Sequence, residues 1–236
     1  MIDIAPDRDP LVRWALPAPG ARVWRRADAV VVACADLSHW DRLVINGEPD
    51  AVAGLLREVL AETGETFRPF GTEELITEVV ARVPELEVSA RFAWMETTDP
   101  VGRQSVDGAV RPVWLGAEAW PEVTGMIREA YPESYAWPGN PGVHRWAGIR
   151  GTGGELLTVA AEAWSTPEIG FMSGVATRPS ARGRGLGATI CAFVADELLA
   201  GRERVALLVD YWNEAALATY TGLGFTTRRV AAARRR

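Results

Sequence analysis

The run Arg182-Gly183-Arg184-Gly185-Leu186-Gly187 constrains the fold most, because it lies between a strand pattern and a helix pattern. Residues 169–177 read as a strand, and residues 187–199 carry apolar side chains at helical spacing. Glycines let a backbone approach a phosphate closely, and the first N–H groups of a helix have no intrahelical acceptor. The run therefore predicts an anion-binding turn, with a turn that serves geometry alone as the alternative.

A dinucleotide site is a second interpretation of the same turn. Gly183, Gly185 and Ala188 satisfy a loose dinucleotide fingerprint, and Asp210 at the end of the next strand could meet a ribose. A dinucleotide-binding fold needs several further strand and helix units after the turn. Too little chain follows here, so a nicotinamide enzyme is disfavoured.

The second half of the chain alternates between strand and helix patterns. Apolar alternation, Gly-rich breaks and amphipathic spacing give the order β, α, three β, α, β, α, β. The expected strands are 112–115, 145–150, 155–164, 169–177, 205–209 and 225–231, and the expected helices are 120–131, 187–199 and 213–222.

A second motif follows the glycine turn. Asn213, Ala216 and Tyr220 fall on successive turns of one helix face, which ends at Gly224-Phe225. The two motifs resemble those of the GNAT superfamily of acyl-CoA-dependent N-acetyltransferases, whose loop reads (Gln/Arg)-x-x-Gly-x-(Gly/Ala). The helix matches that family's Asn-x-x-Ala-x-x-x-Tyr-x-x-x-Gly-Phe pattern without a departure. The resemblance runs over about residues 111–236.

The resemblance implies an α/β (α+β) fold with a mixed, mostly antiparallel sheet and helices on both faces. It implies acetyl-CoA as cosubstrate, with pyrophosphate on the loop amides and the pantetheine arm along one strand. Gly174 could form a bulge that opens the cleft for that arm. The implied cofactor contacts are Val175, Ala176, Thr177, Arg182, Gly183, Arg184, Gly185, Leu186, Gly187, Ala188, Asn213 and Tyr220.

The implied reaction is attack of a primary amine, on a small molecule or a peptide, on the thioester. Tyr220 resembles the family's general acid toward the sulfur, and packing on a helix face is its alternative. Asn213 could equally be a helix N-cap. For the general base we predict Glu162, with Glu168 and Asp210 as rivals. A surface or paired carboxylate is the ordinary alternative, and a non-catalytic acyl-CoA-sensing module would need no base.

Composition narrows the function further. All 25 basic residues are Arg, which excludes a lysine nucleophile and a Walker P-loop. A net charge of −6 argues against nucleic acid as a partner, and Arg234–Arg236 reads as a solvated tail. The two cysteines are too few for a disulfide scaffold or a four-ligand zinc site, and we expect no metal. No apolar run could span a membrane and the first ten residues do not resemble a signal peptide, so we expect a cytoplasmic protein without a membrane partner.

The chain divides by charge. Residues 1–110 hold 11 Arg and 19 acids, whereas residues 111–236 hold 14 Arg and 12 acids. We predict an acidic α+β domain over residues 1–108, with helices at 50–62 and 73–82, and a catalytic domain over 109–236. The first domain resembles the opening of the acetyltransferase fold and could be a degenerate second unit, and a homodimer is an open alternative to a monomer.

Overall fold

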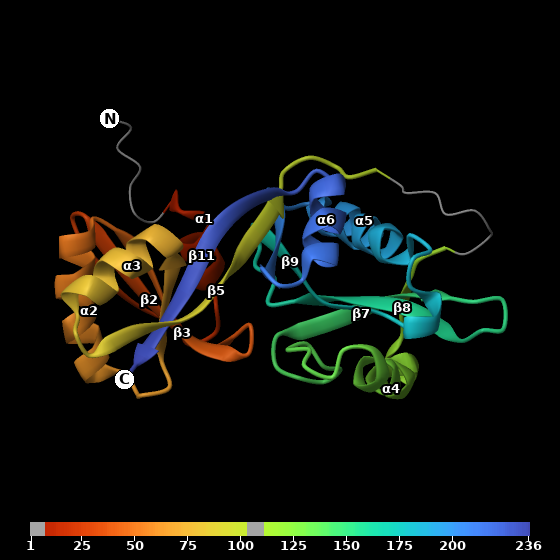
Figure 1. The fold of residues 1–236 in the computed structure, drawn as a ribbon, viewed down its shortest axis with the longest axis horizontal. Coiled ribbons are helices and arrows are strands. Elements are labelled where there is room, and N and C mark those ends of the chain that lie inside the picture. Colours follow the sequence, from red (N-terminus) through yellow and green to blue (C-terminus); the bar gives the residue numbers. More distant parts are fainter. Residues whose placement is uncertain (1–7, 103–110) are drawn as a thin grey trace. The chain divides into compact units, whose positions relative to one another are not determined.

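The chain forms two compact units in the computed structural model, which describes residues 8–102 and 111–236 (Figure 1). Unit 1 consists of Met1–Trp94 and Arg228–Arg236, and unit 2 of Met95–Thr227. The expected domain boundary at residue 108 lies in the segment 103–110, outside the described residues, so the division at that point stays a prediction.

Unit 1 is an α+β layer structure with hydrogen-bonded strand order β1-β2-β3-β4-β11-β5. β3 and β4 are parallel, whereas β1–β2, β2–β3 and β4–β11 are antiparallel. Its elements are α1 (Pro10–Ala15), β1 (Arg22–Arg26), β2 (Ala29–Leu37), β3 (Trp40–Gly47), α2 (Pro49–Glu62), β4 (Arg68–Thr72), α3 (Glu73–Arg82), β5 (Leu86–Thr97) and β11 (Thr226–Arg235).

The core of unit 1 follows from the two helices that the sequence predicts. α2 and α3 turn their apolar stripes toward one face of β2 and β3, where Val31, Leu43 and Ile45 are buried among them. The Thr72 hydroxyl accepts from the Leu75 amide and so caps α3. Both predicted helices are confirmed.

Three elements of unit 1 escape the sequence patterns. α1 begins at Pro10 after an Asp9 cap, within a stretch that looks only Pro-rich. β3 and β4 are the other two, and β4 contains Pro69 and Gly71, both poor strand formers.

The basic C-terminus is also ordered, so its interpretation as a solvated tail is wrong. β11 continues to Arg235, Arg234 pairs with Glu87 at 2.8 Å, and Arg235 donates to the Leu60 carbonyl.

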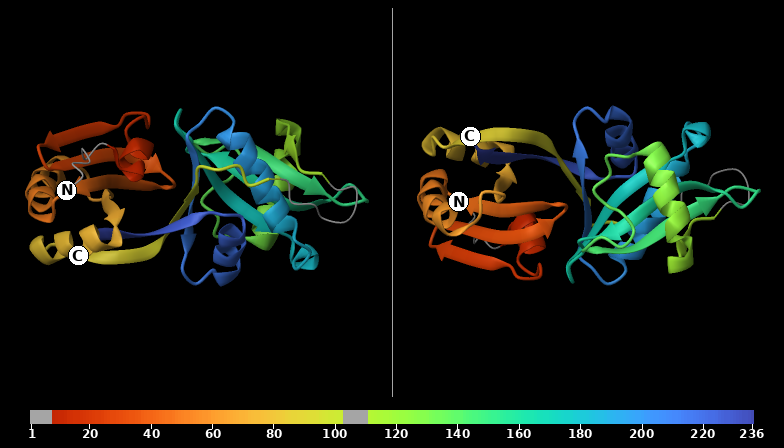
Figure 2. Two further views of the ribbon diagram at one scale, coloured as in Figure 1. Left: turned by 90° about the horizontal axis from the view of Figure 1, so that it is seen from above. Right: turned by 90° about the horizontal axis from the view of Figure 1, so that it is seen from below.

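Unit 2 contains a mixed sheet with strand order β5-β10-β9-β8-β7-β6, to which β5 contributes its last residues. α4 and α5 cover opposite faces of this sheet (Figure 2). β9 and β10 are parallel and the pairs β6–β7, β7–β8 and β8–β9 are antiparallel, which confirms the expected fold class. The elements are β6 (Val113–Leu115), α4 (Trp120–Ala130), β7 (Val143–Arg150), β8 (Leu156–Ala163), β9 (Ile169–Thr177), α5 (Leu186–Leu199), β10 (Arg204–Asp210) and α6 (Glu214–Gly222).

Among the described residues, no helix is long and apolar enough to cross a membrane. The same residues contain no group of three or more His, Cys, Asp and Glu side chains that could hold a metal ion.

Candidate active site

The glycine run forms the turn between β9 and α5. Gly183 and Gly185 have φ values of 75° and 74°, the left-handed region that glycine adopts without strain. Gly185 is the N-cap of α5, so the amides of Leu186, Gly187 and Ala188 lack intrahelical acceptors. The turn therefore presents N–H donors at the positive end of a helix dipole.

Arg182 and Arg184 hold the turn in place through backbone carbonyls. Arg182 donates to Thr177 O at 3.2 Å and to Ala130 O at 3.1 Å, and Arg184 donates to Ser180 O at 2.9 Å. Neither guanidinium makes an ion pair within the part of the chain that the structure describes. Two positive charges beside the amides thus remain for an anionic ligand.

β9 and β10 part beside this turn. Their register pairs run from Ile169↔Arg204 to Phe171↔Ala206, and within the described residues the pairing stops there. The remaining part of β9 includes Val175, Ala176 and Thr177, the residues expected to meet the pantetheine arm. Between Thr158 and Thr177 the hydroxyl oxygens are 2.8 Å apart, which ties the end of β9 to β8 on its other side.

Gly174 forms the expected bulge. β9 places Gly174 and Val175 opposite the single residue Ala160 of β8, and Gly174 has φ +60°. The bulge lies just beyond Phe171, where β9 has left β10.

Tyr220 lies on α6 and is nearly buried. Its ring packs on Phe225 with a centroid distance of 5.9 Å. Burial, together with the neighbouring Cys191 thiol, raises the pKa of Tyr220 well above its ordinary value. The phenol therefore keeps its proton at every physiological pH. Burial likewise raises the pKa of Cys191 to about 12.

Asn213 is the N-cap of α6, as its alternative interpretation expected. Its side-chain oxygen accepts from the backbone amide of Ala216 at 3.2 Å, and the backbone amide of Asn213 donates to the backbone carbonyl of Asp210 at 3.0 Å. The cap occupies the oxygen, and the role toward coenzyme A stays a prediction.

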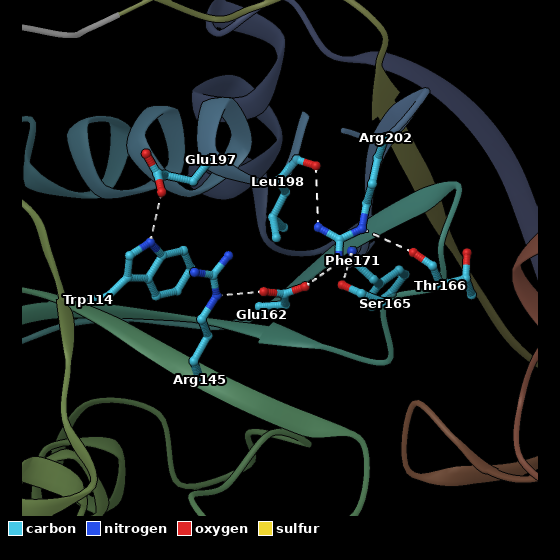
Figure 3. Close-up of polar contacts among 9 residues, drawn as sticks. All are labelled: Trp114, Arg145, Glu162, Ser165, Thr166, Phe171, Glu197, Leu198 and Arg202. Atoms are coloured by element: carbon cyan, nitrogen blue, oxygen red, sulfur yellow. Dashed lines mark hydrogen bonds and ion pairs between the residues drawn. The ribbon is translucent and has the colours of Figure 1, made fainter. Parts of the chain in front are cut away.

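Glu162 lies on the face of the sheet that α5 covers, enclosed by two arginines (Figure 3). Its carboxylate oxygens pair with Arg145 at 2.6 Å and with Arg202 at 2.7 Å. Burial alone would raise the pKa of Glu162, but the hydrogen bond from Arg145 and the charges of both arginines outweigh it and lower the pKa. The general-base role stays a prediction that these contacts disfavour, because both oxygens are occupied.

The two arginines extend this network to α5. Arg145 lies 3.6 Å from the ring centre of Trp114, whose indole N–H donates to Glu197. Arg202 also donates to Thr166 O at 3.0 Å and Leu198 O at 3.4 Å (Figure 3). Glu162 therefore anchors the C-terminal end of α5 to the sheet.

Of the rival carboxylates, Glu168 is exposed before β9, whereas Asp210 lies at the end of β10. Burial, and then the charge of Glu133, raises the pKa of Asp210. Asp210 is four residues beyond Ala206, on the part of β10 that no longer pairs with β9 within the described residues. Sequence reasoning missed Tyr131, whose pKa is raised by burial and then by Asp210.

The anchoring role of Glu162 predicts a pH-dependent stability. We expect Glu162→Gln to lower the free energy of unfolding by about 2–3 kcal/mol, because two partly buried arginines lose their counter-charge. The folded-state pKa is depressed, so this stabilisation is present above the unfolded value and is lost as pH falls below about 4. Urea unfolding monitored by circular dichroism at pH 7 and at low pH measures it.

The matched control is Glu155→Gln, an exposed carboxylate in the β7–β8 turn, which should change stability by less than about 0.5 kcal/mol. An equal and small effect of both substitutions at pH 7 would show that the Glu162 network does not anchor α5.

Comparison with known proteins agrees with this geometry. Residues 148–234 match the family model described as FR47-like protein. No curated protein matches the chain in sequence. The solved structure of a GCN5-related N-acetyltransferase from Kribbella flavida is similar with a TM-score of 0.69 at 18% identity, over 95% of this chain and 92% of that one.

Two further solved structures share the fold. A protein described as a GNAT-family acetyltransferase from Novosphingobium aromaticivorans has a TM-score of 0.61 at 22% identity, over 96% of this chain and 97% of that one. A GCN5-related N-acetyltransferase from Sphaerobacter thermophilus has a TM-score of 0.60 at 14% identity, over 88% of this chain and 80% of that one. The chain therefore has the fold of the GNAT acetyltransferases, a fold that supports acyl transfer, and resembles that superfamily.

Proposed function

We propose that the chain is an N-acetyltransferase that moves an acetyl group from acetyl-CoA to a primary amine of a small molecule or peptide. The parting of β9 from β10 directly beside the glycine turn carries this proposal. Regularly paired strands lie about 4.8 Å apart and leave no room for a third chain. Parted strands that end at an anion-binding turn fit an extended ligand with phosphates at one end.

The chain's residues fit the two ends of such a ligand. The amides of Leu186, Gly187 and Ala188 and the charges of Arg182 and Arg184 suit the pyrophosphate. From Val175 to Thr177, β9 no longer pairs with β10 within the described residues, so its backbone groups can meet the pantetheine amides, with the Thr177 carbonyl already accepting from Arg182.

In the proposed reaction, the amine nitrogen attacks the thioester carbonyl carbon, and the carbon–sulfur bond then breaks. Tyr220 gives its proton to the departing thiolate and regains one from solvent. We assign the acceptance of the amine proton to Asp210 rather than Glu162, because the raised pKa of Asp210 makes it the stronger base.

The charge of the chain favours a cationic acceptor. The net charge is −6, and Glu133 stands close enough to Asp210 to raise its pKa. We place the reaction in the cytoplasm, without nucleic acid, membrane or metal, and leave a homodimer as an alternative to a monomer. A non-catalytic acyl-CoA-sensing module would use the same turn, but would release no thiol with any amine.

Cofactor binding is tested first by thermal unfolding. Acetyl-CoA at 100 times its dissociation constant should stabilise the protein by about 2.7 kcal/mol, and NAD(H) should not. Gly185→Glu should abolish the shift, because it places a carboxylate at the phosphate position. Gly154→Glu is the control: it adds the same charge at a left-handed glycine, φ +87°, in the β7–β8 turn. Loss of the shift in both variants, or no shift in the native protein, would contradict the proposed site.

The acid role of Tyr220 predicts a selective loss of turnover. We expect Tyr220→Phe to lower kcat about 100-fold, with the dissociation constant of acetyl-CoA changed less than about threefold. Thiol release with a panel of amines, beside calorimetric binding, measures both quantities. Tyr135→Phe, which removes an exposed phenol, should leave both unchanged. Native turnover in the Tyr220→Phe variant would refute the acid role.

The base role of Asp210 predicts a change in the pH profile. Burial and Glu133 raise its pKa, so turnover should fall as acidification protonates the carboxylate. Asp210→Asn should lower kcat about 100-fold and remove that limb of the profile. Glu162→Gln should keep the limb, and the opposite pattern would return the base role to Glu162.

A further inference from the structure

Trp146 is a buried indole that the proposed mechanism does not use. It lies on β7, is fully buried, and its Nε1 has no hydrogen-bond partner within the described part of the chain. Its register partners are Ala161 of β8 and then Ser173 of β9, and Arg145 and Glu162 point to the α5 face. Because side chains alternate along a strand, Trp146 lies on the α4 face.

The far edge of the indole contacts the bulge. A Cβ built on Gly174 would lie 2.6 Å from Cη2 and 3.0 Å from Cζ3 of Trp146, and 3.1 Å from the Ala136 side chain. The small Ala161 leaves the indole free to reach across β8. The close approach exists because residue 174 has no side chain.

The bulge coincides with the reactive end of the proposed ligand. At the other end, a Cβ built on Gly187 at the start of α5 would lie 3.8 Å from the Thr177 hydroxyl. If the pyrophosphate of acetyl-CoA lies at the start of α5 and its pantetheine arm runs along Val175–Thr177, the acyl group lies at Gly174, near the point where β9 leaves β10. Trp146, which is fully buried, fills the space on the α4 side of Gly174, directly behind that acyl group.

We propose that Trp146 determines acyl-chain specificity by closing the space at the Gly174 bulge to anything longer than a short acyl group. This inference rests on the proposed function. The indole is held in place because it is fully buried and its edge lies directly against Gly174 in a closely packed interior. A pocket that lacks room for one methylene discriminates by about 10–200-fold.

Acyl-CoA binding tests the proposal without knowledge of the acceptor. We expect native protein to bind butyryl-CoA at least about 10-fold more weakly than acetyl-CoA. Trp146→Phe withdraws the ring from Gly174 and also removes the unpaired N–H, and it should bring the two dissociation constants within about threefold of each other. Calorimetry measures the constants, and thiol release with one amine gives the same ratio as kcat/KM.

Trp94→Phe is the matched control, because Trp94 is equally buried but belongs to unit 1. It should leave the acyl preference of the native protein unchanged. Trp146→Met, whose side chain is flexible, is the second variant should Trp146→Phe lose its folded circular dichroism spectrum.

The outcomes separate the inference from the function on which it rests. If no acyl-CoA binds the native protein, the proposed function fails. If acetyl-CoA binds but the butyryl-to-acetyl ratio is equal in native, Trp146→Phe and Trp146→Met proteins, the specificity role alone is refuted. A change confined to the KM of the amine would place Trp146 in the acceptor pocket and also refute it.

Discussion

The arrangement of unit 2 depends on the parting of two parallel strands. β9 and β10 pair as far as Phe171 and Ala206, and their carboxyl ends then separate. Because α5 follows β9 and α6 follows β10, both helix N-termini flank the opening. The glycine turn, Asn213 and Asp210 all stand there for this topological reason, and ligands of open α/β sheets bind at the carboxyl ends of strands for the same reason. A β-bulge increases the local twist of its strand, and the bulge at Gly174 lies just where β9 leaves β10.

Unit 1 shows what the same order of elements gives without the parting. It repeats three strands, a helix, a strand, a helix and a strand, and its β3 and β4 are also parallel. A Cβ on Gly71 of β4 would lie 3.0 Å from the Ile45 carbonyl of β3, so these strands stay close. The chain before α2 reads Gly47-Glu48-Pro49. At this helix start Glu48 brings a negative charge and Pro49 has no N–H, whereas the start of α5 in unit 2 presents free backbone amides. The degenerate-unit interpretation stays a prediction, and this comparison explains why one chain would hold one anion turn.

Local sequence patterns predicted the elements of unit 2 and the bulge at Gly174. They could not predict which face of the sheet each helix covers or which residues of different strands lie side by side. Alternation along β8 places the side chains of Glu162 and Ala161 on opposite faces of the sheet. The pattern of a single strand does not say which of these faces α5 covers. The choice between Glu162 and Asp210 needs the parallel register of β9 and β10, which is a long-range property. Trp146 reads as an ordinary core tryptophan until Gly174 is placed beside it. β4 was missed because Pro69 and Gly71 are stabilised there by neighbours on both sides rather than by propensity.

An opening between paired strands has an energetic cost, which contacts on both sides of the turn offset. Backbone groups of β9 beyond Phe171 that would otherwise pair with β10 need other partners, and Arg182 supplies one for the Thr177 carbonyl. Arg178 pairs with Glu129 and Arg182 donates to Ala130 O, which ties the turn to the end of α4. Glu162, Arg145 and Arg202 tie the opposite end of α5 to the sheet. With α5 held at its C-terminus and the turn held to α4, the helix amides keep their direction while the strands stay apart. The Glu162 network therefore fixes one end of a helix whose other end forms the anion-binding turn of the proposed function.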